Sequence, residues 1–171
     1  MSSSSTARTT TTGTDHVANQ ASVGLLTRSE ALAALAVPGV SERHSPLVGT
    51  PLFAVDLRGG EAPLGSEERV AALATLASFP CPTIGLTEPS IATHDDDPFR
   101  TSLDVVVESV EDLDRLAAAV RAAPIAAMTL VQVLRLGEHL TVDEALLVES
   151  LAYGTLLAGP EHRRWLVSRG R

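Results

Sequence analysis

The last third of the chain carries its most regular pattern and constrains the fold most strongly. It reads TVDEALLVESLAYGTLLAGPEHRRWL from Thr141 to Leu166. Thr141 with Glu144 fits a capping box, in which a hydroxyl and a carboxylate satisfy unpaired N–H groups where a helix begins. Gly159-Pro160 predicts that this helix ends and a second begins, because Gly tolerates the left-handed position after a helix and Pro suits a first turn.

Apolar side chains give the first of these two helices one broad hydrophobic face. The residues predicted to form it are spaced three or four apart, at Ala145, Val148, Ala152 and Leu156, with Leu147 and Leu151 widening the stripe. A stripe of this width needs cover from another element or from a partner protein. The six side chains are therefore expected together on one covered face.

Short apolar runs alternate with helix patterns earlier in the chain. Three runs bounded by Pro, Gly or polar turns are predicted strands, at residues 52–57, 83–86 and 103–107. Helices are predicted at residues 31–37, 67–77, 110–122 and 125–136, with Ser66 as the N-cap of the second. We predict an α/β fold. It has a small parallel sheet and flanking helices in residues 22–123, and a helical C-terminal part in residues 124–171 that packs on the sheet or on a partner subunit.

Composition excludes several classes of function. The net charge of -8 argues against nucleic-acid binding, which needs a basic face to displace counterions. All 13 basic residues are Arg, so Schiff-base and general-base chemistry by Lys is excluded. No apolar run reaches the length of a membrane span. Neither nucleic acid nor membrane is expected as a partner.

The lone cysteine and the N-terminal composition bear on location. Cys81 cannot form an internal disulfide, which suits a reducing cytosol, and a cytoplasmic location is expected. Residues 1–20 lack the continuous apolar segment of a secretory signal. Residues 1–21 are rich in Ser and Thr and are expected to be a disordered tail, with a cleaved targeting peptide as the alternative.

Four consecutive residues, His94 to Asp97, form the most metal-like cluster of the sequence. Carboxylates and an imidazole are ligands for Mg²⁺ or Ca²⁺, and such a site would suit a metal-dependent hydrolase. Neighbouring side chains rarely converge on one ion without alternating spacing and a Gly turn. A solvated acidic loop is therefore the favoured interpretation, and no metal is expected.

The turn after the first predicted strand could bind an anion. Gly59-Gly60 and Gly65-Ser66 flank it, and backbone N–H groups at a helix start can cradle a phosphate or an oxyanion. The spacing matches neither a P-loop nor a dinucleotide-binding fingerprint. An ordinary strand-to-helix turn is the alternative.

Several single residues have both a chemical and a structural interpretation. Cys81 is a candidate nucleophile with His94, but its flanking prolines favour a buried structural thiol. Glu144 and Glu149 are candidate acid/base carboxylates, although the first is explained as a cap and the second as a surface residue. His162–Arg164 could meet an anionic ligand or could lie on a solvated helix.

The C-terminal segment resembles the crotonase superfamily, the enoyl-CoA hydratase/isomerase-like proteins. The resemblance lies in PIAAMTLVQVLR, then EALLVESL, then a Tyr-containing turn into AGPEHRRWLVSR, between Pro124 and Arg169. Upstream, FAVDLRGG and FPCPTIGL look like degraded versions of two family strands. The resemblance implies a crotonase-like sheet and a protein that handles an acyl-CoA thioester by hydration or double-bond isomerisation.

The resemblance also implies where chemistry would occur. The first oxyanion donors would map to the backbone of Leu64 and Gly65, Arg residues would meet the coenzyme A phosphates, and coenzyme A would be part of the substrate rather than a cofactor. After Leu86, however, the chain lacks the family's Gly-rich turn, which supplies the second donor, and the central catalytic segment. Losing one donor typically costs about 2.7–4 kcal/mol of transition-state stabilisation. Weak or no turnover is therefore expected.

A non-catalytic role is the alternative to acyl-CoA chemistry. Helix 125–136 is apolar nearly all round, which is typical of a buried or interface helix. Together with helix 142–157 it would dock onto a full crotonase subunit or onto a copy of this chain. Whether the protein is an enzyme stays open at this point.

Overall fold

The computed structural model describes residues 24–59, 65–89 and 97–170. Within these ranges the chain forms four strands: β1 (Leu25–Thr27), β2 (Phe53–Asp56), β3 (Thr83–Leu86) and β4 (Val105–Val107). They pair in the order β1-β2-β3-β4, and every pair is parallel. The predicted α/β class with a small parallel sheet is confirmed, and β1 is a strand that the sequence pattern did not predict.

Eight helices accompany these strands in the described ranges. They are α1 (Arg28–Leu35), α2 (Val40–Arg43), α3 (Ser66–Ala77), α4 (Pro98–Thr101), α5 (Val110–Ala122), α6 (Pro124–Gly137), α7 (Val142–Ala158) and α8 (Pro160–Arg169). The capping box predicted at Thr141 is present, and its hydroxyl accepts a hydrogen bond from the backbone of Glu144. Ser66 is not the N-cap of α3 as predicted. Gly65 takes that place, because it is the residue with extended backbone angles (φ -60°, ψ 151°) before the helix.

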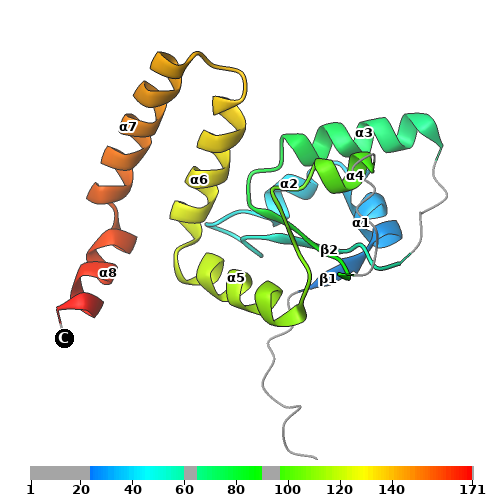
Figure 1. Ribbon diagram of the computed structural model, residues 1–171, viewed down its shortest axis with the longest axis horizontal. Helices are drawn as coiled ribbons and strands as arrows, with labels where there is room; N and C mark the ends of the chain where they lie inside the picture. Colours follow the sequence, from blue (N-terminus) through cyan, green and yellow to red (C-terminus); the bar gives the residue numbers. More distant parts are fainter. Residues whose placement is uncertain (1–23, 60–64, 90–96, 171) are drawn as a thin grey trace, which may run out of the picture.

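Alternate residues of the central strands face two different hydrophobic layers. Phe53 and Val55 pack with α1 and α3, whereas Ala54 and Ile84 pack with α5. Figure 1 shows α3 and α5 on opposite sides of the sheet. Because both faces of β2 and β3 are covered, these strands appear in the sequence as continuous apolar runs.

Gly85 on β3 packs closely against the layer that includes α1 and α3. A Cβ atom there would lie 2.7 Å from Cδ1 of Leu57 and 2.8 Å from Cδ1 of Leu103. Both leucines are buried and have little room to move. Only glycine therefore fits at this position without displacing the core.

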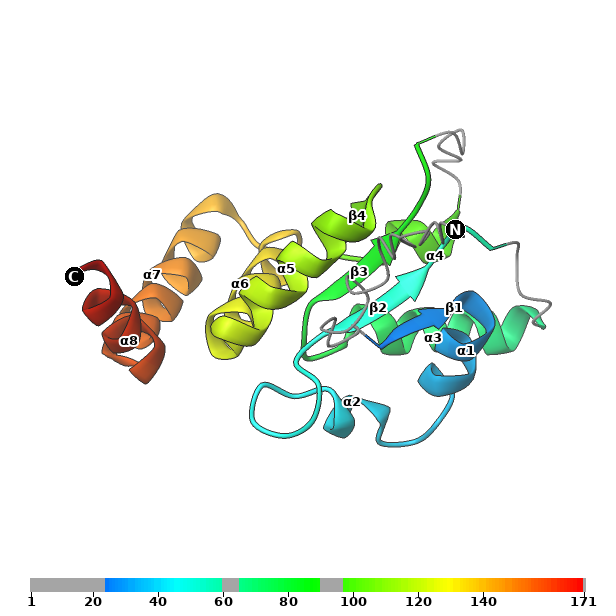
Figure 2. The ribbon, with the colours of Figure 1, turned by 90° about the horizontal axis from the view of Figure 1, so that it is seen from below.

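The last three helices extend away from the sheet and are called the helical arm. α6 and α7 form an antiparallel hairpin, and α8 follows α7 after a break at Gly159. In α6 only Val131 is buried, and neither α7 nor α8 has a buried residue. Figure 2 shows α7 and α8 at the end of the molecule remote from β1.

The covered face of α7 is narrower than predicted. Four predicted residues are half-buried on the face that packs against α6: Ala145, Val148, Ala152 and Leu156. Leu147 and Leu151 were wrongly assigned to this face, because they are 62% and 65% exposed. At 100° of rotation per residue, Leu147 projects from the far side of the helix and Leu151 from its flank.

The predicted disordered tail, residues 1–21, lies outside the described residues. In the described ranges no single helix has the length and hydropathy to span a membrane. α5 and α6 meet that criterion only as a pair bent by 106°.

Candidate functional site

The predicted oxyanion donors belong to the turn between β2 and α3. Leu64 lies outside the described residues. Gly65 is exposed, and its carbonyl accepts the first helical hydrogen bond from the N–H of Arg69. Ligands of open α/β sheets bind outside the carboxyl ends of the strands, so the N–H of Gly65 lies on the edge of the sheet where such a donor is useful.

The first turn of α3 is acidic, which disfavours an anionic ligand there. Glu67 and Glu68 are both exposed, and Oε2 of Glu68 lies 3.8 Å from where a Cβ on Gly65 would be. Carboxylates at this distance repel a phosphate or a developing oxyanion. Gly59 has open space around it, so no close backbone approach requires glycine there, and Gly60 lies outside the described residues.

Both carboxylate oxygens of Asp97 make structural contacts within the chain. Its Oδ1 accepts the N–H of Phe99 at 3.0 Å as the N-cap of α4, and its Oδ2 pairs with Nη1 of Arg28 at 2.7 Å. His94, Asp95 and Asp96 lie outside the described residues. Among residues 24–59, 65–89 and 97–170, no group of three or more His, Cys, Asp or Glu side chains is arranged to hold a metal.

Cys81 is a structural thiol, as its flanking prolines indicate. The residue is fully buried in the layer that includes α1 and α3. Burial raises the pKa of the thiol to about 12, although the Arg135 guanidinium partly opposes the shift. Because the thiolate is the nucleophilic form, the pKa of this buried thiol makes it inert at neutral pH.

Glu144 is a helix cap, and Glu149 is a surface residue. The Glu144 carboxylate accepts hydrogen bonds from the hydroxyl of Thr141 at 2.7 Å and from its N–H at 2.9 Å. These bonds hold the pKa of Glu144 below its ordinary value, so it is an ionised cap. Glu149 is exposed on α7.

The basic side chains after α7 contact the end of that helix. Nδ1 of His162 lies 2.9 Å from the carbonyl of Leu157, and the guanidinium of Arg163 donates to the carbonyl of Ala158 at 3.0 Å. The last carbonyls of a helix carry partial negative charge and favour a cation such as the Arg163 guanidinium. These two residues therefore cap their own chain, while Arg164 is exposed.

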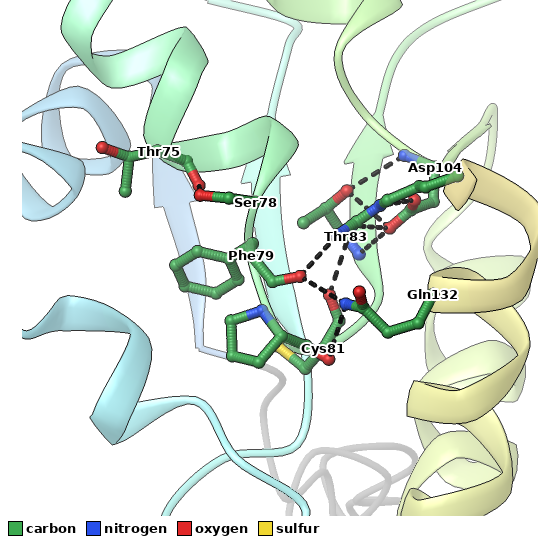
Figure 3. Close-up of polar contacts among 9 residues, drawn as sticks. Thr75, Ser78, Phe79, Cys81, Thr83, Asp104 and Gln132 are labelled. Atoms are coloured by element: carbon green, nitrogen blue, oxygen red, sulfur yellow. Dashed lines mark hydrogen bonds and ion pairs between the residues drawn. The ribbon is translucent and has the colours of Figure 1, made fainter. Parts of the chain in front are cut away.

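A polar cluster attaches the helical arm to the amino ends of β3 and β4 (Figure 3). Asp104 accepts hydrogen bonds from the N–H and the hydroxyl of Thr83, at 2.7 and 2.8 Å. The same carboxylate pairs with Nη2 of Arg135 on α6 at 2.7 Å, and both side chains are at most 20% exposed. Gln132 donates to the carbonyl of Phe79 at 3.0 Å, and Arg135 donates to that carbonyl too.

Glu161 of α8 caps the start of α6, and sequence reasoning missed this. Its two carboxylate oxygens accept the N–H groups of Ile125 and Ala126, each at 2.9 Å. α6 begins without a side-chain cap of its own, so this carboxylate satisfies donors that would otherwise be unpaired. The contact holds α8 against the start of α6.

The helical arm carries most of the large hydrophobic side chains that the described structure exposes. Twelve of 18 lie there: Leu130, Leu134, Leu136, Val142, Leu146, Leu147, Leu151, Tyr153, Leu157, Trp165, Leu166 and Val167. Large exposed apolar patches are typical of sites of interaction with another molecule. The arm is therefore the strongest candidate for the functional part of the described structure.

The side of α7 that faces away from α6 forms the centre of this surface. It is called the α7 outer face, and its exposed residues are Asp143, Leu146, Leu147, Ser150, Leu151, Gly154, Leu157 and Ala158. Gly154 has no neighbouring atom within 4 Å of the position that a Cβ would take. The α7 outer face thus combines leucines with a shallow strip of small residues.

A groove of about 800 Å³ lies between the arm and the segment from α4 to β4. Asp104, Arg135, Glu138, His139 and Glu149 contribute its charged or titratable lining. Asp104 and Arg135 already satisfy each other, and the remaining lining is of mixed character. The groove is therefore the boundary between the arm and the sheet region.

The chain matches no protein-family model, no curated protein and no solved structure in the three comparisons made.

Proposed function

We propose that this protein is a non-catalytic assembly protein, which joins another protein chain through its helical arm. The observation that carries the proposal is α7, a 17-residue helix rich in Leu, Val and Ala that has no buried residue. Keeping apolar surface in water costs about 25 cal/mol per Å². The arm therefore gains stability when another molecule covers it. The resemblance to the crotonase superfamily suggests a related subunit or a copy of this chain as that molecule.

The arm is held in place before any partner binds, which supports the proposal. Gln132 and Arg135 attach α6 to the sheet region, and Glu161 attaches α8 to α6. A surface that is already ordered loses little conformational entropy on binding. Among the candidate catalytic side chains that the structure describes, Cys81 lies in the core, and Asp97 and Glu144 cap helices. Glu149 is exposed on α7.

Light scattering tests the proposal on the full chain at about 1 to 100 µM, because association follows mass action. The wild type is expected to exceed the single-chain mass of 17.9 kDa as concentration rises. Leu147→Glu combined with Leu151→Glu is expected to remain at that mass, because it places charges on the α7 outer face. The double variant Leu47→Glu/Val48→Glu is the matched control, since these side chains are 80% and 69% exposed outside the arm. Equal behaviour of all three proteins would contradict the proposal.

An acyl-CoA thioester is the second candidate ligand, and the position of Gly65 favours it. Its N–H lies at the start of α3, beyond the carboxyl end of β2, where an oxyanion donor would be required. Glu67 and Glu68 oppose this candidate because they repel anionic groups. It therefore ranks below assembly.

Substitution of Gly65 tests the acyl-CoA candidate. Pro fits the backbone of Gly65 (φ -60°) but removes its N–H, whereas Ala retains the N–H. Calorimetric titration with crotonyl-CoA is expected to show equal binding to wild type and Gly65→Ala, and weaker binding to Gly65→Pro. Absence of binding to coenzyme A, acetyl-CoA and crotonyl-CoA at millimolar ligand would exclude this candidate.

A further inference from the structure

We infer that the partner on the α7 outer face is a second copy of this chain, packed antiparallel so that Leu147 of each copy lies over Gly154 of the other. This inference rests on the proposed assembly function and specifies its partner and geometry. It follows from the spacing, shape, charge and area of the α7 outer face.

The spacing of the α7 outer face is that of a helix-pairing seam. Asp143, Leu147, Ser150, Gly154 and Leu157 follow one another at intervals of four, three, four and three residues, and all are exposed. An average interval of 3.5 residues keeps a seam facing a second helix along its length. α7 therefore presents a seam for a helix on the side opposite α6.

The shape of the seam is self-complementary only in the antiparallel direction. With a twofold axis between Ser150 and Leu151, Leu147 lies opposite Gly154 of the other copy, and the reverse contact is identical. A twofold interface requires this reciprocity. The open space at Gly154 accepts the leucine side chain, whereas a parallel pair would set leucine against leucine and leave the two glycines facing each other.

Charge favours the same direction. The start of α7 carries Asp143 and Glu144, and the guanidinium of Arg163 lies at its end, where it donates to the carbonyl of Ala158. Antiparallel packing brings the acidic start of each helix to the basic end of the other. Parallel packing would bring like charges together at both ends, which is unfavourable.

The available apolar area matches the need of a dimer. A fully buried Leu or Val side chain removes roughly 60–120 Å² of apolar surface from water. Six large apolar side chains of α7 and three of α8 are 40–75% exposed, and covering all nine would remove about 500 Å² of apolar surface per copy from water. A standard interface buries about 800 Å² per partner, of which about 65% is apolar in homodimers.

Access to the α7 outer face is open. Figures 1 and 2 both show α7 at the far end of the molecule, with α6 between it and the sheet. A second copy can therefore approach α7 without meeting β1, α1 or α3 of the first.

Disulfide cross-linking of variants with one added cysteine tests the direction of packing. The native Cys81 is buried and does not interfere. Ser150→Cys, beside the twofold axis, is expected to cross-link with itself, and Asp143→Cys with Ala158→Cys in a mixture. Asp143→Cys is expected not to cross-link with itself, because its two copies lie about 22 Å apart at 1.5 Å per residue, while a disulfide needs Cα atoms about 4.4–6.8 Å apart.

The size of residue 154 tests the contact itself. Gly154→Leu is expected to raise the dimer dissociation constant at least about tenfold, because it fills the space that Leu147 of the other copy requires. The helix itself gains from the change, since Gly is a poor helix former, so circular dichroism should show undiminished helix content. Thr155→Leu adds a leucine beside the seam and is expected to leave the dissociation constant unchanged.

Three results would overturn the inference. Asp143→Cys that cross-links with itself would establish parallel packing. If the protein associates in light scattering but none of the expected cross-links form, the proposed assembly function is retained and this packing geometry is wrong. A monomer that co-sediments with phospholipid vesicles would identify a lipid surface as the occupant of the α7 outer face.

Discussion

Arg135 is the side chain on which attachment of the helical arm depends most. Its guanidinium donates to both carboxylate oxygens of Asp104, at 2.8 and 2.7 Å, and to the carbonyl of Phe79. A planar group with five N–H donors can satisfy several acceptors at once, which Lys cannot do in the same geometry. One residue of α6 thereby joins the arm to the loop before β3 and to the start of β4.

Arg135→Gln is expected to lower the free energy of unfolding by about 2–3 kcal/mol, because it leaves a half-buried carboxylate without its cation. Arg58→Gln is the matched control. Its pair with Asp56 is also 2.7 Å long but more exposed, and exposed pairs contribute little. Urea denaturation measures both. Equal losses for the two variants would show that the Asp104 pair has no special part in stability.

The raised pKa of the Cys81 thiol predicts that the folded protein loses stability as pH becomes alkaline. Its pKa is about 12 in the folded chain, against an ordinary value of 9.0, because burial favours the neutral form. The unfolded chain therefore releases this proton first as pH rises. The stabilising contribution is complete below about pH 9 and falls progressively towards pH 12.

The urea midpoint of the wild type should fall between about pH 9 and 11 more steeply than that of Cys81→Ala. The chain has no Lys and one Tyr, so few other side chains titrate in this range. Parallel pH profiles for the two proteins would refute the role assigned to the buried thiol.

The sequence predicts residue roles well where the partners are local. The cap at Thr141 follows from Glu144 three residues away, and the structure has it. Gln132 and Arg135 carry a weaker signal, as two polar residues three apart on an apolar helix. The sequence carries no signal for the role of Glu161, because its partners on α6 are 35 and 36 residues distant.

At the scale of elements, α8 is fixed to α6 through a single carboxylate. Glu161 accepts two backbone N–H groups at the start of α6, where the helix dipole also favours a negative charge. The break at Gly159 lets α8 turn towards this site. The position of α8 therefore depends on one side chain more than on core packing, since α8 has no buried residue.

Glu161→Gln is expected to loosen α8, because a neutral amide offers one carbonyl oxygen where the carboxylate offers two. Hydrogen exchange at Ile125, Ala126 and residues 160–169 should accelerate severalfold. Glu138→Gln, an exposed substitution at the other end of α6, is the control and should leave these rates unchanged. Unchanged exchange in Glu161→Gln would mean that other contacts hold α8.

Element boundaries were predicted most accurately where the pattern is long or both faces are buried. β3 occupies residues 83–86 and α5 residues 110–122, as predicted. β1 has only three residues and therefore no periodicity to detect. On α7 the apolar residues encircle the helix, so periodicity alone could not assign Leu147 and Leu151 to the correct side.

At the scale of the whole molecule, the sheet region buries its own apolar side chains, whereas the arm leaves many of its own exposed. Two hydrophobic layers close over the four strands, whereas the arm leaves twelve large apolar side chains exposed. The sheet could be predicted because its strands and caps are encoded locally. The side of α7 that stays exposed could not be predicted, because it depends on which face of α7 packs against α6, and that is decided by tertiary structure.

Hydrogen exchange of the unmodified chain as a function of its concentration tests the central claim most directly. Covering the α7 outer face stabilises α7 by mass action, so amides in residues 142–158 should exchange more slowly at about 100 µM than at about 1 µM. Amides in α3 and α5 should exchange at the same rate at both concentrations. Exchange in α7 that is independent of concentration would contradict assembly through this helix.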